Sequence, residues 1–428
     1  MEKSIMTKET NPHQTTIVNH GWRVTFTAMG INLALGILYT WSVISKRIPA
    51  DWGWNEEDKS LPYMFACLIF SLIMVPAGRM QDKIGPRIVA ITGGLLVGAG
   101  FIITSITTSL CGFVIGFGIL AGAGIGFGYA STTPPAVKWF PAAKTGLIAG
   151  IVVSGFGLAS VYAAPLTTYL VNNLGFQGAL LFWGIAFLFV VVGFALFLKS
   201  PPAGYIPTDS PPTASVVINN KKEEFQPKEM LGTVQFYMIW FMYACGAGAG
   251  LMIISKLAAI ADQQVGITLG FVLVAVLAIG NGTGRVLAGT FSDKFGRKAM
   301  LFICFVSQAI LIFLLSKTTR TSPLANMPVL AVISALIGAN YGANLSLFPS
   351  ITKDFYGINN FGVNYGLVFT AWGVGGFMLA KLAGAMYVKH QTFNIAYYGA
   401  AGLLILAAIM VFLLKAPHHN IETAELKA

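Results

Sequence analysis

The chain has 428 residues, of which 55% are hydrophobic and only 10% are charged, and its mean hydropathy is +0.72. Soluble globular proteins carry about 25% charged residues, so this composition cannot cover a water-facing surface and excludes a soluble enzyme. The formal net charge of +11 does not indicate a nucleic-acid partner, because the basic residues form no stripe interleaved with aromatic residues. We therefore expect an all-α membrane protein.

Apolar runs long enough to cross a bilayer recur along the whole chain. A transmembrane helix needs about 20 apolar residues. Twelve such runs cover residues 22–44, 61–79, 88–108, 111–137, 145–170, 178–198, 233–257, 268–290, 299–316, 323–349, 360–388 and 393–415. The long polar stretch between the sixth and seventh runs is rich in proline and charge, as linkers are. We expect one six-helix half in 1–198, a cytoplasmic linker in 199–232, and a second six-helix half in 233–428.

Lys and Arg are distributed unevenly between the two sides of these spans. With a cytoplasmic N-terminus, 18 of the 27 basic residues fall on the inner side and seven on the outer side, while Arg285 and Lys381 lie within spans. Basic residues gather on the cytoplasmic side of membrane proteins. The pattern predicts a multi-pass protein of the plasma (inner) membrane with both termini cytoplasmic.

One pattern, G-x-x-x-D-K-x-G followed by an arginine within two residues, occurs at residues 78–87 and again at residues 289–298, after the second and the eighth span. A repeat at equivalent places indicates two duplicated halves. Its acids are Asp82 and Asp293, and the arginines that follow its second glycine are Arg87 and Arg297. An acid beside basic residues and a facing helix N-terminus can latch a gate. The same contacts could instead only fix the loop geometry, and the pattern does not choose between these roles.

The predicted spans contain no acid and no chemistry typical of an enzyme. All 16 Asp and Glu residues fall in loops, tails or span ends, and the five histidines lie in tails or at a helix end. The four cysteines lie in apolar runs without metal-ligand spacing. We therefore predict no enzymatic activity, no metal and no cofactor.

Arg285, about four residues before the predicted end of span eight, is the most informative residue inside the membrane. A charged side chain in a span costs about 2.5–3.5 kcal/mol, and no acid in a span neutralises this one. Asn281 lies four residues earlier on the same helix face, so an amide and a guanidinium could bind a carboxylate together. The alternatives are that Arg285 reaches the cytoplasmic interface or pairs with a loop acid such as Asp293.

Other polar or bulky residues within spans are candidates for the walls and gates of a cavity. Lys381 in span eleven could gate or couple transport, or it could reach the outer headgroups. Trp372 in the same span is a large apolar plug. The remaining candidates, each with helix packing as its alternative, are Asn32, Tyr39, Tyr129, Tyr243, Tyr341 and Asn344.

The repeated loop pattern resembles that of the major facilitator superfamily, and the resemblance covers essentially the whole chain. Within that family, three segments are similar to the oxalate/formate antiporter group and related monocarboxylate transporters. They are residues 281–285 running into 292–297, residues 139–141, and residues 39–41. The resemblance implies a twelve-helix fold of two six-helix halves, alternating access, a cavity lined by the first, fourth, seventh and tenth helices, and a substrate carboxylate at Arg285.

Two departures from these relatives bear on substrate and coupling. Oxalate exchangers carry a lysine in a Thr-Ala-Lys context in span eleven, whereas Trp372 follows Thr370 and Ala371 here. One cation leaves a dianion uncompensated at low dielectric, which favours lactate, pyruvate or formate. Proton-linked relatives have an Asp at the position of Asn281. The sequence therefore leaves three kinds of coupling open: a proton carried on the substrate, a proton carried by Lys381, and exchange of anions without protons.

The sequence thus predicts a monomeric secondary transporter of small monocarboxylates, whose partners are a small carboxylate anion and the lipid bilayer, with protons left open. An alternative is an oxalate/formate-type exchanger that uses Arg285 and Lys381 as its two cations. A third hypothesis, a non-transporting carboxylate sensor that signals through the linker, ranks last because the linker is too short for a signalling domain.

Overall fold

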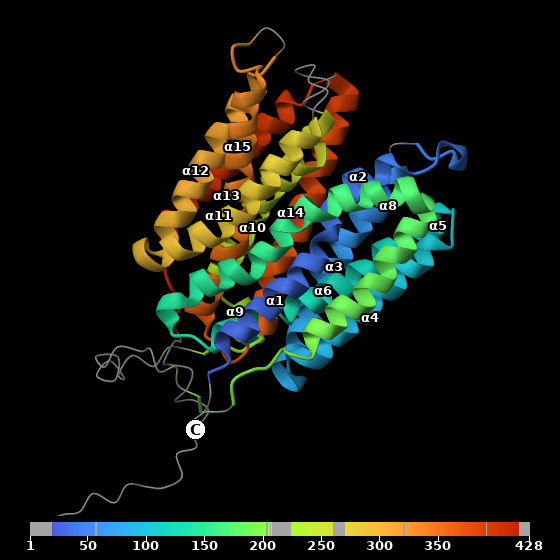
Figure 1. Cartoon of the computed structure of the whole chain (residues 1–428). Helices are drawn as coiled ribbons and strands as arrows, with labels where there is room; N and C mark the ends of the chain where they lie inside the picture. The colour runs from blue at the N-terminus through green and yellow to red at the C-terminus, as the bar shows by residue number, and fades with distance from the viewer. Residues whose placement is uncertain are drawn as a thin grey trace, which may run out of the picture.

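The computed structural model describes residues 19–55, 58–202, 204–205, 207, 224–259, 270–319, 322–390 and 392–418. The described residues form helices and no strand (Figure 1). The first half contains α1 (Gly21–Leu35), the 3₁₀ turn η1 (Gly36–Thr40), α2 (Trp41–Lys46), α3 (Leu61–Ile84), α4 (Pro86–Ser105), α5 (Leu110–Phe113), the π-helical segment Val114–Ala121, α6 (Gly122–Ala130), α7 (Thr133–Lys138) and α8 (Thr145–Ala195). The second half contains α10 (Val234–Ala259), α11 (Gly270–Phe295), α12 (Arg297–Ser316), α13 (Met327–Tyr356), α14 (Phe361–His390) and α15 (Asn394–Leu413).

These elements make twelve membrane crossings, as the sequence predicts. Ten described segments are long and apolar enough to span a bilayer. One of them contains all of α8, in which Gly175 has the left-handed φ of 73° and separates spans five and six. The first crossing is not one of these ten segments, because η1 divides it into the shorter helices α1 and α2. The fold is therefore the twelve-helix arrangement of two six-helix halves.

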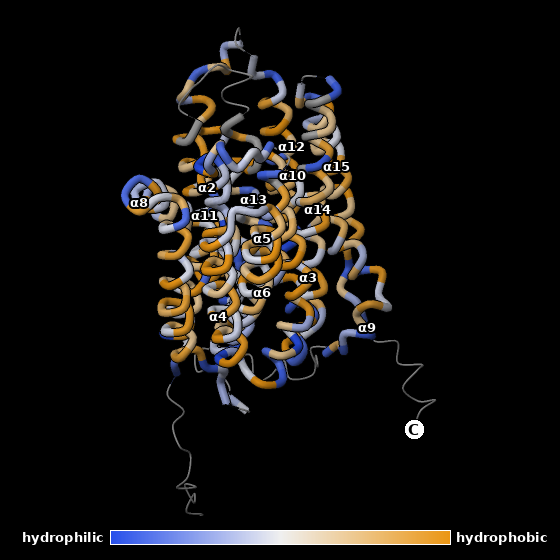
Figure 2. The backbone as a smooth tube through the Cα atoms, turned by 90° about the vertical axis from the view of Figure 1, so that its right-hand side faces the viewer, coloured by the Kyte–Doolittle hydropathy of each residue, from blue (hydrophilic) through white to orange (hydrophobic). Residues whose placement is uncertain are grey.

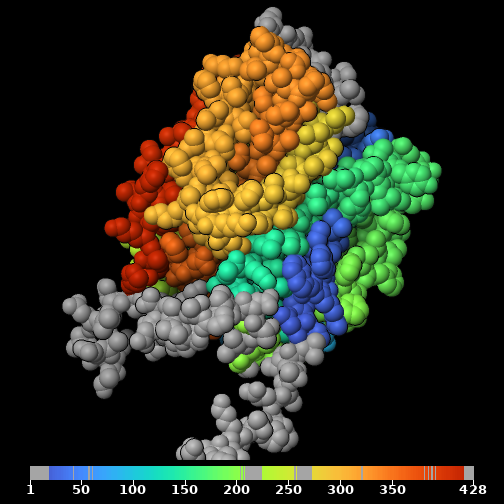
Figure 3. All heavy atoms as spheres, turned by 60° about the vertical axis from the view of Figure 1, so that its left-hand side comes forward, coloured from blue at the N-terminus to red at the C-terminus, as the bar shows by residue number. Residues whose placement is uncertain are grey.

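The two halves meet along two long helix pairs, α8 against α11 and α3 against α14. Figure 3 shows the yellow α11 lying beside the green α8 at this boundary. Both pairs rely on glycine where the backbones cross. A Cβ at Gly78 would lie 2.2 Å from the carbonyl oxygen of Gly362, and a Cβ at Gly146 would lie 2.3 Å from that of Gly289. Gly78 and Gly289 are the first residues of the two repeated loop patterns, so this position of the pattern allows the halves to approach closely.

The repeated loops lie at one end of the bundle, which we call the loop-motif end. At this end α1 begins, since Trp22 packs on Phe140 after α7, and α15 finishes, since Phe412 packs on Phe302 of α12. Both ends of the helical bundle therefore lie on one side, as twelve crossings require. Along the bundle, Figure 2 shows apolar backbone colours through the helices and hydrophilic ones at their ends.

Several helices run further toward the loop-motif end than the hydropathy pattern predicts. α3 ends at Ile84 rather than at residue 79, and α11 ends at Phe295 rather than at 290. Asp82 and Asp293 consequently lie in the last turns of helices, not in loops. Gly85 and Gly296, with φ of 88° and 89°, then turn the chain into the next helix. Polar last turns are tolerated here because the other half of the protein supplies their partners.

Most of the expected linker lies outside the described residues, but its last part is ordered against the second half. Glu224 accepts hydrogen bonds from the backbone amides of Ile358 and Asn359, and the Phe225 amide donates to the carbonyl of Tyr356. The short helix α9 (Pro227–Leu231) follows, with Gln226 and Glu229 forming a capping box. This end of the linker is therefore fixed to the α13–α14 connection.

Candidate functional site

A small closed cavity lies at the centre of the bundle, between the halves. Its walls come from η1, α3, α6 and α8 of the first half and from α11, α13 and α14 of the second. They consist of Tyr39, Phe70, Tyr129, Phe156, Arg285, Leu345, Phe369 and Trp372. The side chains close on one another and leave no room for a water molecule. The structure thus shows the site in a closed state, and Arg285 is the one charged residue among these wall residues.

Arg285 is fully buried, with none of its surface exposed. Its Nε donates to Asn281 Oδ1 at 2.9 Å, and its Nη1 donates to the backbone carbonyl of Val153 in the other half. Its Nη2 has no hydrogen-bond partner. Among the described residues, no carboxylate lies within ion-pair distance of the guanidinium. A buried cation with one free nitrogen favours an anionic ligand.

The depth of Arg285 corrects the expectation from the sequence. Because α11 continues to Phe295, Arg285 lies ten residues before the helix end, about 15 Å along the axis. Its side chain does not reach the interface, since it is fully buried. It does not pair with Asp293 either, because that carboxylate is held by Arg297 and by backbone amides. In this structure, therefore, Arg285 neither reaches the cytoplasmic interface nor pairs with Asp293.

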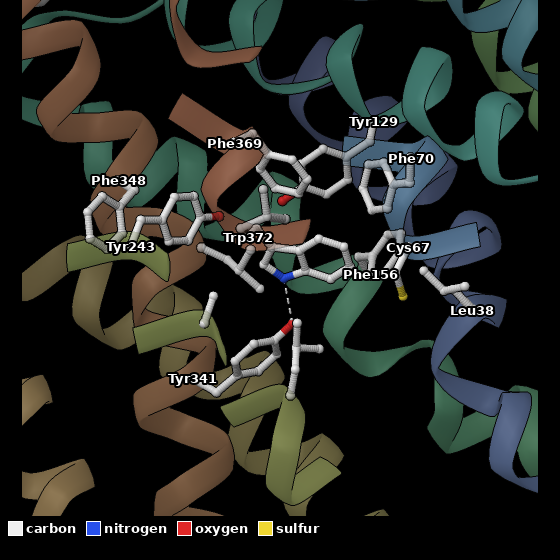
Figure 4. Close-up of a cluster of buried hydrophobic side chains, with 14 of the residues drawn as sticks. Leu38, Cys67, Phe70, Tyr129, Phe156, Tyr243, Tyr341, Phe348, Phe369 and Trp372 are labelled. Carbon is white, nitrogen blue, oxygen red and sulfur yellow. Dashed lines mark hydrogen bonds between the residues drawn. The ribbon is translucent and has the colours of Figure 1, made fainter. Parts of the chain in front are cut away.

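A chain of hydrogen bonds also joins the halves at the wall of the cavity. The hydroxyls of Tyr39 in η1 and Tyr341 in α13 lie 2.5 Å apart, and Trp372 Nε1 donates to Tyr341 at 2.9 Å. Figure 4 shows Tyr341 and Trp372 with this bond between them. Gly36 lets η1 approach α8, since a Cβ there would lie 2.4 Å from the Phe156 carbonyl oxygen. These three predicted residues are brought together.

The other uncharged candidates do not line the cavity. Asn32 donates to Thr132 and to the carbonyl of Val152, so it joins helices within the first half. Asn344 donates to the carbonyl of Asn340 on its own helix. Tyr243 is buried and stacks on Phe348, with ring centroids 4.2 Å apart, behind Phe369 of the cavity wall.

Lys381 is also separate from the cavity. It is exposed, its Nζ lies 5.8 Å from the centroid of the Phe377 ring, and it follows Trp372 by nine residues. That separation is about 13 Å along α14. The two intramembrane cations predicted from the sequence therefore do not face one ligand in this closed state.

Three phenylalanines of the cavity wall are not among the residues that the sequence predicts. Phe70, Phe156 and Phe369 come from spans two, five and eleven, and they pack around Tyr129 with centroid distances of 5.3–5.5 Å. A buried Phe in an apolar helix gives no sequence signal that separates a cavity wall from ordinary core. The first, fourth and tenth spans do contribute, as the family resemblance implies, but the seventh contributes none of these wall residues, and the second, fifth, eighth and eleventh contribute as well.

Two carboxylates hold the halves together at the loop-motif end. Asp293 accepts from the amides of Gly146 and Leu147 at the start of α8, both at 2.9 Å, and pairs with Arg297 at 2.6 Å. These contacts use the helix N-terminus, where the peptide dipoles favour an anion. The sequence predicted such an arrangement as one of two roles for this acid.

Asp82 makes the equivalent contacts with the start of α14. It accepts from the amides of Gly362 at 3.2 Å and Val363 at 3.0 Å. Its basic neighbour is Lys138 at 3.7 Å, which the sequence did not single out, while Arg87 is exposed. The two contacts are thus related by the internal repeat but unequal, because Arg297 forms a close ion pair with Asp293, whereas Pro86 stands at the matching position of the first copy.

Comparisons with known proteins agree with this architecture. A family model described as Major Facilitator Superfamily matches residues 25–269 and 252–428. The chain is 28% identical to the uncharacterised MFS-type transporter YhjX of Escherichia coli (strain K12), over 80% of this chain and 82% of that protein. It is 25% identical to the oxalate:formate antiporter of Oxalobacter formigenes, over 78% and 77%. It is also 25% identical to monocarboxylate transporter 13 of Rattus norvegicus, over 93% and 89%.

A solved structure is similar in fold. The human organic anion transporter MFSD10 (TETRAN) matches with a TM-score of 0.69 and 12% identity, over 91% of this chain and 99% of that one. At this identity the likeness concerns the arrangement of the helices alone.

Proposed function

Because the chain belongs to the major facilitator superfamily, we propose that it is a secondary transporter of small monocarboxylates, of the lactate, pyruvate or formate class, that works by alternating access. The observation that carries the proposal is Arg285, a fully buried cation in the central cavity with one unpartnered nitrogen. A substrate carboxylate would supply the missing acceptor. The antiporter and monocarboxylate transporter among the relatives support the same substrate class.

The contacts of Arg285 suggest how binding is linked to movement. In the closed state its Nη1 is held by the Val153 carbonyl of the other half. When the halves separate, this bond breaks and the guanidinium has two free nitrogens, which match the two oxygens of a carboxylate. The Asp82 and Asp293 contacts then gate the loop-motif end, and the Tyr39–Tyr341 contact gates the other end. The basic residues gathered at the loop-motif end support a cytoplasmic position for it, in a plasma (inner) membrane.

A monoanion fits this site better than a dianion. Lys381 is exposed and lies about 13 Å beyond Trp372 along α14, so it does not compensate a second carboxylate in the cavity. An uncompensated second charge at low dielectric is costly. Among the described residues no Asp, Glu or His lines the cavity. In cotransport, a proton would therefore travel on the substrate itself. The alternative to cotransport is an exchange of anions without protons.

Uptake into proteoliposomes tests the substrate class. The purified protein should take up labelled lactate, pyruvate or formate, and oxalate should compete weakly. Acceleration of uptake by an inward proton gradient would indicate cotransport, and acceleration only by internal carboxylate would indicate exchange. Uptake of none of the three monocarboxylates, or a clear preference for oxalate, would contradict the proposal.

Gly157→Ala should weaken carboxylate binding about tenfold. A Cβ at this position of α8 would lie 3.1 Å from Arg285 Nε, 3.1 Å from the backbone nitrogen of Gly282 and 3.2 Å from Asn281 Oδ1, so it would displace the pair that carries the charge together with this part of α11. Gly193→Ala in the same helix is the matched control, since no atom lies within 4 Å of its Cβ. The measurement is the shift in melting temperature against carboxylate concentration. Equal affinities for the two variants would show that the position of the pair does not matter.

A further inference from the structure

Three buried tyrosines beside the cavity have hydroxyls without hydrogen-bond partners. They are Tyr129 of α6, Tyr243 of α10 and Tyr365 of α14, and at most 2% of each residue is exposed. The Tyr365 hydroxyl faces those of Tyr129 and Tyr243 closely enough for weak mutual contacts, but none of these contacts has the geometry of a full hydrogen bond. In native proteins nearly every buried hydroxyl is paired, since leaving one unpaired is costly. Three at one place, contributed by both halves, therefore indicate a site that is incomplete without a ligand.

The aromatic ring of Phe369 lines the cavity and packs against all three tyrosines. Its centroid is 5.3 Å from that of Tyr129, 6.0 Å from Tyr243 and 5.7 Å from Tyr365. Figure 4 shows Tyr129 and Tyr243 reaching from opposite sides with their hydroxyls turned toward the centre. Tyr129 also lines the cavity with Arg285. The region thus has a cationic pole at Arg285 and a neutral hydroxyl pole at the three tyrosines.

We propose that Tyr129, Tyr243 and Tyr365 bind a hydroxyl or keto oxygen of the substrate, and so select hydroxy and keto monocarboxylates over plain ones. This inference rests on the proposed function, because it assumes that the carboxylate binds Arg285. Phenol hydroxyls both donate and accept hydrogen bonds, so they can pair with either kind of oxygen. They carry no charge that could compensate a second carboxylate.

The closed packing of the cavity is part of this proposal. No water molecule fits between the side chains, so a ligand must displace the Phe369 ring to reach both poles. When a substrate with an oxygen at its second carbon displaces this ring, that oxygen forms hydrogen bonds with the three hydroxyls. Propionate has the same carbon skeleton as lactate but leaves them unpaired, and sites built to bind a substrate hydroxyl reject analogues that lack it.

Thermal stabilisation of the full-length protein by lactate and by propionate tests the proposal. Wild type should need at least ten times more propionate than lactate for the same rise in melting temperature. Tyr365→Phe and Tyr243→Phe, which remove only the hydroxyl, should lose this preference because lactate binding falls to the propionate level. Without ligand their melting temperatures should fall little, since the deleted hydroxyls form only weak contacts with one another. Tyr397→Phe in α15, another buried tyrosine, is the matched control and should keep the preference.

Two results would overturn the inference: equal affinity of wild type for lactate and propionate, or a preference that survives in both Tyr→Phe variants. A large fall of the ligand-free melting temperature in both variants would also oppose it, because it would assign the hydroxyls a structural role. Failure of the proposed function is distinguishable. In that case neither acid stabilises the protein, and Arg285→Gln behaves in the same way. If both acids stabilise wild type and neither stabilises Arg285→Gln, the carboxylate site is upheld even when lactate and propionate bind equally.

Discussion

Arg285→Gln is expected to abolish carboxylate transport and to lower carboxylate affinity at least thirtyfold, while the protein remains folded. Truncating one partner of a buried, hydrogen-bonded charge pair costs about 2–5 kcal/mol. The same change should raise the melting temperature without ligand, because wild type buries a cation that no carboxylate of the described residues neutralises. Opposite signs for binding and stability are the signature of a residue that is kept for a ligand.

Arg285→Lys separates charge from geometry. Lysine keeps the charge but loses the planar fork and the Nε donor that binds Asn281 at 2.9 Å. We expect affinity between those of wild type and Arg285→Gln. Lys381→Gln is the control for an intramembrane cation and should transport normally, because Lys381 does not line the cavity. Uptake of labelled lactate and pyruvate, together with melting curves, provides the measurement. Wild-type uptake by Arg285→Gln would remove the basis for an anionic substrate.

The features of this site that the sequence predicted are those that violate the rules of a membrane interior. A cation in a span, an amide four residues before it and a duplicated acidic loop pattern each need a special explanation, so they can be recognised without a structure. In the structure, Arg285 and Asn281 share one helix face and a hydrogen bond. The twelve crossings follow from hydropathy for the same reason, since lipid enforces apolar surfaces.

What the sequence could not predict depends on contacts between distant segments. α11 extends past its apolar run because Asp293 finds the amides of Gly146 and Leu147, nearly 150 residues away in the chain. Phe369 resembles any buried aromatic residue until the tyrosines around it are known. Lys138 replaces Arg87 as the basic neighbour of Asp82 because α7 ends there.

Asp293→Asn is expected to open the loop-motif end, by shifting the closed-to-open equilibrium about tenfold to a hundredfold. The carboxylate accepts two backbone amides at 2.9 Å and pairs with Arg297 at 2.6 Å. Hydrogen bonds to charged groups contribute about 1.5–3 kcal/mol each, and an amide side chain retains one acceptor but turns a donor toward other donors. Asp82→Asn should have a smaller effect, because its amide contacts are 3.0 and 3.2 Å and Lys138 is 3.7 Å away.

Pulsed EPR distances between spin labels at positions 88 and 228 measure this opening, since Ile88 of the first half and Lys228 of α9, which is fixed to the second half, are both exposed at the loop-motif end. The exposed Cys111 is first replaced by Ser, so that the labels attach only at these positions. Asp354→Asn is the matched control. Asp354 binds the same Arg297 at 3.0 Å, but from α13 of the same half, so its loss should leave the distance distribution unchanged. If Asp354→Asn opened the end as far as Asp293→Asn, the acids would act by fixing loop geometry, and the bond between the halves would not be the latch.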